Sequence, residues 1–89
     1  MKRTRSKKRN NYIHFKRRIR ERYGISVNRV EYKELRNQVR NKGIFLGRQR
    51  ANRTVYQVNL RGMKIIVVYD NRAGNIVTTL YPGRSYRLV

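Results

Sequence analysis

Apolar and polar positions follow the period of a helix along the first half of the chain. In the first stretch, apolar side chains recur three or four residues apart: Tyr12, Phe15, Ile19 and Tyr23. At about 100° per residue these side chains form one stripe, which predicts a helix over residues 11–23. Asn10 or Asn11 can cap the start of this helix, and Gly24 offers the left-handed conformation on which helices often end.

A second helix is predicted over residues 29–42, mainly from the residues at its start. Asn28 is a good N-cap, and Glu31 stands three residues later, as a capping box requires. Gly43 follows the last turn and ends the helix. The apolar face of this helix is narrow and consists of Tyr32, Leu35 and Val39.

After Gly43 the pattern changes to the alternation that is typical of strands. Four segments are predicted as strands: 44–50, 54–60, 63–69 and 76–81. Segment 63–69 is apolar on both faces through Ile65–Val68, which predicts a central strand. The connections are too short for the crossovers that parallel strands need. The expected fold is therefore α+β, with two N-terminal helices followed by a four-stranded antiparallel β-meander.

The start of the chain differs from the rest. Residues 1–11 contain one apolar side chain, Met1, among many cations. Such a segment cannot bury enough surface to offset the entropy of ordering it, which predicts a disordered basic arm. Residues 12–89 are then expected to form a single α+β domain, because a chain this short builds one core.

Charge points to the partner. The chain has 24 lysines and arginines against 4 acids, a formal net charge of +20. Nucleic acid is the first candidate, because each neutralised phosphate releases condensed counterions; an anionic membrane surface is less favoured. Most of the cations are arginines, whose planar group binds phosphate and stacks on bases, and 7 tyrosines accompany them. This pairing favours RNA over DNA.

Composition also excludes several classes of site. Without cysteine there is no disulfide framework and no thiolate metal site. One histidine and four scattered acids give no cluster of metal ligands, so neither a metal nor a cofactor is expected. No stretch approaches the roughly 20 apolar residues of a membrane-spanning helix, and the basic start lacks the apolar core of a signal peptide. We therefore expect a cytoplasmic protein without a membrane partner.

Residues expected to bind nucleic acid fall into three groups. The arm supplies Lys2, Arg3, Arg5, Lys7, Lys8 and Arg9; the first helix supplies Arg17, Arg18 and Arg22; the first hairpin supplies Arg48, Arg50 and Arg53. The arm is expected to bind phosphate without reading sequence. The helix and the hairpin are expected to form one functional basic face.

Two motifs carry a resemblance to known proteins. The spacing H-x-x-x-R-x-x-E-R-Y-G-I begins at His14, and the segment VVYDNRAGNIVTTLYP spans 67–82. Together with the order of helices and strands, they resemble small phage and prophage proteins related to the barnase–colicin–RelE-like superfamily of metal-independent ribonucleases. The resemblance covers about residues 14–83 and implies a fold of this type.

Metal-independent RNA cleavage needs a proton acceptor, a proton donor and cations on the phosphate. His14 can fill either proton role near neutral pH, and Arg18 can hold the phosphate. Glu21 can orient or tune one of them, and the three residues lie within about 60° on a helical wheel. The hydroxyls of Tyr69 and Thr79 on the predicted sheet are further candidates.

Another interpretation of the same residues stays open. The face with His14 lies opposite the apolar stripe, so it can be a solvated polar face with an intrahelical ion pair. Two functions therefore remain: a metal-independent endoribonuclease, or a non-catalytic binding module that inhibits or remodels a host nucleoprotein complex as an anti-defence or takeover protein. Either would act in the cytoplasm of a bacterial host.

Overall fold

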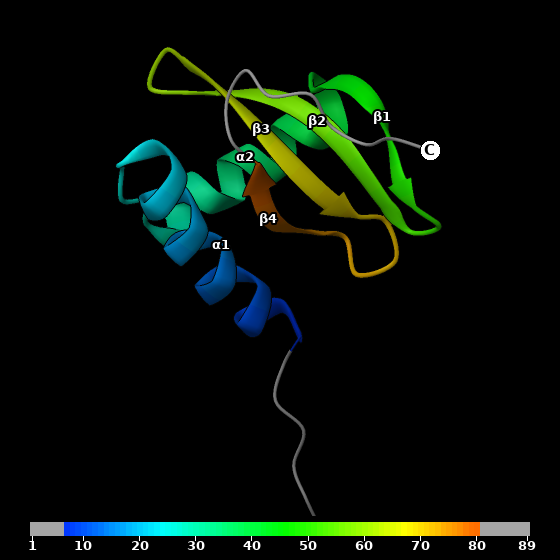
Figure 1. Ribbon diagram of the computed structural model, residues 1–89, viewed down its shortest axis with the longest axis horizontal. Helices are drawn as coiled ribbons and strands as arrows, with labels where there is room; N and C mark the ends of the chain where they lie inside the picture. The colour runs from blue at the N-terminus through cyan, green and yellow to red at the C-terminus, as the bar shows by residue number, and fades with distance from the viewer. Residues whose placement is uncertain (1–6, 81–89) are drawn as a thin grey trace, which may run out of the picture.

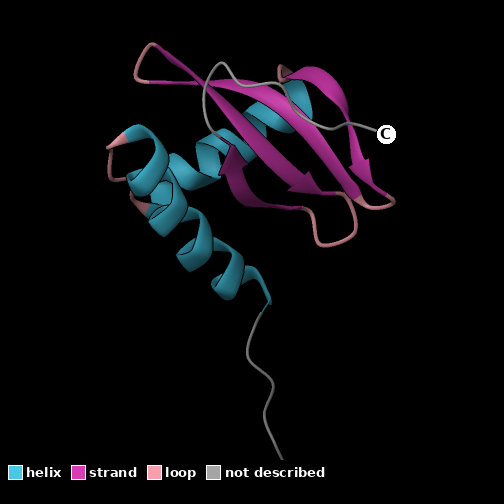
Figure 2. Ribbon diagram, viewed as in Figure 1, coloured by secondary structure: helices cyan, strands magenta, loops and turns pink. Residues whose placement is uncertain are grey.

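The computed structural model describes residues 7–80, with side chains from residue 11 onward, and has the predicted α+β fold (Figure 2). Two helices precede four strands. Their bounds are α1 Lys7–Tyr23, α2 Arg29–Asn41, β1 Ile44–Arg50, β2 Arg53–Leu60, β3 Met63–Asp70 and β4 Asn75–Leu80. The last residue predicted for the fourth strand, Tyr81, lies outside the described residues.

The strands form one antiparallel sheet in the order β1-β2-β3-β4. β3 pairs with β2 on one side and with β4 on the other, so the prediction of a central strand over 63–69 is confirmed. Both faces of β3 are buried: Ile65 and Val67 face the helices, and Ile66 and Val68 belong to a second cluster on the other side. A strand that is buried on both faces does not need to alternate apolar and polar residues.

The start of α1 corrects one prediction. The helix begins at Lys7, four residues before the predicted position, so residues 7–11 are not a disordered arm. Residues 1–6 of the predicted arm lie outside the described residues. Lysine, arginine and asparagine can extend a helix that is already nucleated, and lysine and arginine are good helix formers. Apolar periodicity, which set the predicted boundary, gives no signal for such a polar extension.

Both helices lie against the same face of the sheet (Figure 1). The apolar stripe of α1 is directed inward, where Phe15 and Ile19 are fully buried. The ring of Tyr32 from α2 lies 5.1 Å from that of Tyr12 and 5.5 Å from that of Phe15. α1 packs mainly on β4, and α2 packs on β2. The two helices therefore share one core, which leaves the outer side of α1 uncovered.

Two helix signals read from the sequence are confirmed, whereas the cap predicted at Asn10 or Asn11 is wrong, because both residues lie inside α1. Gly24 has a φ of 71° and donates its N–H to the carbonyl of Arg20, which ends α1. At the start of α2 the Asn28 side chain accepts from the N–H of Glu31 at 2.8 Å, and the Glu31 carboxylate accepts from the N–H of Asn28 at 3.2 Å. This is the predicted capping box.

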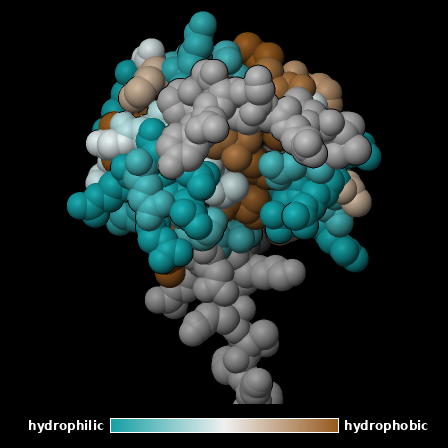
Figure 3. All heavy atoms as spheres, viewed as in Figure 1, coloured by the Kyte–Doolittle hydropathy of each residue, from teal (hydrophilic) through white to brown (hydrophobic). Residues whose placement is uncertain are grey.

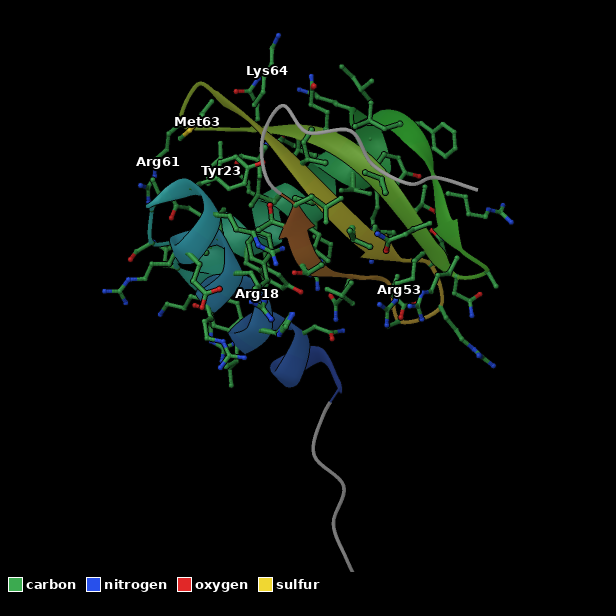
Figure 4. All side chains as sticks on the ribbon, viewed as in Figure 1. Arg18, Tyr23, Arg53, Arg61, Met63 and Lys64 are labelled. Atoms are coloured by element: carbon green, nitrogen blue, oxygen red, sulfur yellow. The ribbon has the colours of Figure 1, made fainter. Side chains whose placement is uncertain are left out.

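The end of α1 is tied to the last strand. Figure 4 shows Tyr23 directed from α1 toward the sheet. Its hydroxyl donates to the carbonyl of Leu80 at 2.8 Å and accepts from the N–H of Ile66 at 3.1 Å. The neighbouring guanidinium of Arg22 donates to the carbonyl of Thr79. Three backbone groups of β3 and β4 thus depend on two side chains of α1.

Tyr32 ties α2 to the same strand. Its side chain is buried, and its hydroxyl donates to the carbonyl of Ile76 at 2.6 Å. Burial raises the pKa of Tyr32 to about 12, because the phenolate would lose its hydration.

This pKa makes stability depend on alkaline pH. Tyr32 has an ordinary pKa of 10.0, so its stabilising contribution is fully present below pH 10 and is lost as the pH rises through about 12. We expect the free energy of unfolding of the wild-type protein to fall across this window more steeply than that of Tyr32→Phe, as measured by urea titration. At neutral pH the variant should lose about 1 kcal/mol with the hydrogen bond. If the free energies of unfolding of the two proteins fell equally across this pH window, the dependence could not be assigned to Tyr32.

Candidate nucleic-acid interface

The outer side of α1 carries a group of exposed cations. Lys16, Arg17 and Arg20 are all exposed, and with Ile13 and Ser26 they line an open groove of about 210 Å³. No hydrogen bond or ion pair to another described residue engages these three cations. Figure 3 shows hydrophilic side chains gathered over α1. We call Lys16, Arg17 and Arg20 the α1 basic surface.

Arg29, the first residue of α2, extends this surface. Its guanidinium carbon lies 4.5 Å from the centre of the Tyr12 ring, and the Lys16 ammonium lies 5.8 Å from the same centre. Both distances allow cation–π attraction, which holds two long side chains near the end of the groove. Of these four cations only Arg17 was predicted to bind. The spacing of Lys16 and Arg20, four residues apart on one helix face, was a signal that could have found them.

The other two predicted cations of the first helix are already engaged. Arg18 donates to the carboxylate of Glu21 at 3.0 Å, and both side chains are partly exposed. Arg22 is half-buried and donates to the carbonyl of Thr79. An exposed ion pair of this kind contributes only a few tenths of a kcal/mol, so Arg18 can exchange its partner for a phosphate. Arg22 can do so only by giving up a contact that holds β4.

The structure places the two parts of the predicted single basic face, the first helix and the first hairpin, at opposite edges of the sheet. α1 packs on β4, whereas the hairpin contains β1, and these two strands form opposite edges of the sheet. Three strand spacings separate the edges by about 14 Å. Arg48 and Arg50 are exposed on β1, and Arg53 lies 3.6 Å from the carboxylate of Asp70. In Figure 4, Arg18 and Arg53 lie on separate parts of the molecule.

The cations predicted in the arm are only partly described. Lys2, Arg3 and Arg5 lie outside the described residues. Lys7, Lys8 and Arg9 form the first turns of α1, and their side chains are not described. Helical backbone at these positions places three further cations on the same helix as the α1 basic surface.

His14 is half-buried on the flank of α1 rather than fully solvated. Burial lowers the pKa of His14, and the positive charges of Arg18, Arg17 and Arg22 lower it further; only Glu21 acts in the other direction. The imidazole is therefore neutral at pH 7. A neutral imidazole can accept a proton, but it is a poor source of the proton that a leaving group needs.

The two hydroxyls predicted on the sheet are buried. Thr79 is fully buried, and its hydroxyl donates to the carbonyl of Ile66 at 2.6 Å. Tyr69 is buried on the helix-facing side, and its hydroxyl accepts from Arg40 at 3.0 Å. All the charged groups that shift the pKa of His14 belong to α1. The structure therefore brings His14 together with Arg18 and Glu21 but does not add the predicted hydroxyls to a shared open site.

Other arginines support the fold. Arg40 donates to the Tyr69 hydroxyl and, at 3.0 Å, to the carbonyl of Gly74. Arg61 reaches the Glu31 carboxylate at 2.8 Å and the carbonyl of Ser26 at 2.7 Å. Arg36 donates to the side-chain oxygen of Asn75 at 2.9 Å. Hence the net charge of +20 overstates the number of cations that are free to meet a ligand.

Within residues 7–80, no three histidine, cysteine or acidic side chains are placed to share a metal ion. Neither of the two described helices has the length and apolar composition needed to cross a bilayer. Comparison of the chain with known protein families, with curated proteins and with solved structures finds no match. The resemblance to metal-independent ribonucleases stays a prediction, and the α1 basic surface is the feature that bears on function.

Proposed function

We propose that this protein binds nucleic acid through the phosphate backbone, with RNA favoured over DNA, and that it acts without cleaving its ligand. The observation that carries the proposal is the α1 basic surface, where Lys16, Arg17 and Arg20 are exposed and free of ion pairs with described residues. Three like charges on one helix face destabilise the free protein slightly, and a polyanion relieves this repulsion.

Local packing makes this surface suitable for phosphates. Phe15 and Ile19 anchor the inner side of α1 in the core, so the outer side has a fixed position without needing its own contacts. Long lysine and arginine side chains can then adapt to the spacing of a sugar–phosphate backbone. Each phosphate that they neutralise releases counterions, which favours binding to any sequence.

Catalysis has weaker support. His14 is neutral and close to cations, as a proton acceptor for a ribose hydroxyl should be. The complementary proton donor is lacking among the predicted residues, because the hydroxyls of Tyr69 and Thr79 are buried in hydrogen bonds. The arrangement thus favours binding over cleavage.

The test is a binding titration of the full chain with a single-stranded RNA at two salt concentrations. Three phosphate contacts give a log–log salt slope of about −2, so affinity should fall at least about 20-fold between roughly 50 and 200 mM salt. RNA should remain intact after incubation in EDTA. His14→Ala should bind within about twofold of wild type, since a neutral imidazole adds little to counterion release.

Two results would contradict the proposal in different ways. Binding that is absent or insensitive to salt would exclude the phosphate interface. Metal-independent cleavage that leaves a 2′,3′-cyclic phosphate and disappears in His14→Ala would establish the endoribonuclease instead. A DNA strand of the same sequence serves as the ligand control, and tighter binding to it would contradict the preference for RNA.

A further inference from the structure

Phe45 on the edge strand β1 is unusual among the aromatic residues. Its side chain is 62% exposed, whereas every other tyrosine or phenylalanine among residues 11–80 is buried or half-buried. An exposed aromatic ring on an edge strand costs stability and invites association. We therefore expect the exposed ring of Phe45 to contact a partner.

The ring of Phe45 is held in place from behind. It lies edge-on to the ring of Tyr56, with centroids 5.9 Å apart and planes at 75°. Tyr56 in turn meets Tyr69 at 6.2 Å and 88°. The Tyr69 hydroxyl accepts from Arg40, which also donates to the carbonyl of Gly74. A row of three rings thus runs across β1, β2 and β3, fixed at its inner end and open at Phe45.

A cation lies on the same face of β1. Phe45 pairs with Tyr56 and Arg48 with Thr54, and both of these β2 residues face the helix side of the sheet. A bulge between Phe45 and Gly47 gives β1 an extra residue, so two side chains three positions apart project in the same direction. Arg48 is exposed, and β1 contains no acidic residue. The two residues between them leave this face clear, because Leu46 packs against the cluster on the other face and Gly47 pairs with Val55 of that cluster.

We infer that Phe45 is a stacking platform for an unpaired nucleobase and that Arg48 binds the adjoining phosphate, which makes single-stranded RNA the ligand class. This inference rests on the proposed function and adds a second contact region at the sheet edge opposite α1. A preoriented aromatic face beside an arginine is the combination that binds single strands, because every base has a face that can stack. A duplex keeps its bases stacked on one another and cannot use the platform.

The absence of tryptophan from the chain allows a direct test. Phe45→Trp places the only indole at the platform of the full-length protein. A short single-stranded RNA should quench its fluorescence. An abasic strand with the same sugar–phosphate backbone, or the same RNA in a duplex, should leave it nearly unchanged. Ile44→Trp is the matched control, because Ile44 is 55% exposed on the same strand and pairs with Gln57, not Tyr56.

Affinity gives an independent readout. Phe45→Ala should weaken binding to the single-stranded RNA by about 5- to 150-fold and leave binding to the abasic strand unchanged. Phe45→Tyr should bind the single-stranded RNA as tightly as wild type. Unchanged thermal unfolding of both variants is expected at so exposed a position and shows that the fold is intact.

Four outcomes would overturn the inference. Equal quenching by the abasic strand would mean that no base stacks on the ring. Quenching that depends on protein concentration without RNA would identify a second copy of the chain as the partner. If wild-type protein binds RNA with the expected salt dependence, but Phe45→Trp shows no quenching and Phe45→Ala no loss of affinity, only the stacking platform is excluded. If wild-type protein binds no RNA, the proposed function fails as well.

Discussion

Phe15→Ala is expected to lower the free energy of unfolding by about 3–5 kcal/mol, the range measured for large-to-small changes at buried aromatic positions. The Phe15 side chain is fully buried between α1 and the sheet, and its ring lies 5.5 Å from that of Tyr32. Removing it leaves a cavity in the core that the two helices share with the sheet. Small domains have only about 5–15 kcal/mol of stability in total, so a large part would be lost.

The measurement is a urea or thermal unfolding curve, in which the midpoint temperature should fall by about 4–8 °C for each kcal/mol. Ile13→Ala is the matched control. Ile13 lies on the same helix but is 52% exposed, so its change should stay within about 0.5 kcal/mol. Equal effects of the two substitutions would mean that α1 does not pack on the sheet through its predicted stripe.

Replacing all three cations of the α1 basic surface is expected to weaken RNA binding by about 100- to 500-fold at 0.1 M salt. The variant combines Lys16→Gln, Arg17→Gln and Arg20→Gln. Each lost phosphate contact reduces the log–log salt slope by about 0.7 to 0.9, so three contacts reduce it by about 2 to 3 units. Glutamine is a good helix former, and none of the three side chains makes a hydrogen bond within the described structure, so α1 should stay folded.

A second triple variant separates a defined surface from an evenly spread charge. Lys33→Gln, Lys64→Gln and Arg72→Gln remove the same charge from exposed positions on α2, β3 and the turn that follows it. If a local surface binds RNA, this variant should bind nearly as well as wild type. Equal weakening of the two variants would show that net charge alone attracts the ligand, without an interface on α1.

The elements that the sequence predicts well are those with a local or periodic signal. The capping box of Asn28 and Glu31 spans four residues, so it can be recognised without knowledge of the fold. β3 is central because its apolar residues need cover on both faces, and this pattern is also visible in the sequence. The extra turn of α1 before residue 11 lacks such a signal, since polar residues can either extend a helix or lie outside it.

The candidate site was less predictable because it depends on contacts between distant residues. Nothing local to the first helix indicates that it packs on β4, at the sheet edge opposite the first hairpin. The role of each arginine is equally non-local: Arg22 and Arg40 find partners 57 and 29 residues away. The exposure of Phe45 likewise depends on the place of β1 at the edge of the sheet.

The bonds between α1 and β4 also have a consequence for synthesis of the chain. Arg22 and Tyr23 bond to carbonyls 57 residues further on, so these bonds cannot form until β4 has left the ribosome. While the chain is emerging, the rings of Tyr12 and Phe15 can contact residues of the second helix such as Tyr32, but not the sheet. Contacts between such distant residues also form slowly, because a long loop must close first. The first helix to be translated is therefore the last element to be secured, and until then its apolar stripe needs protection from other nascent chains.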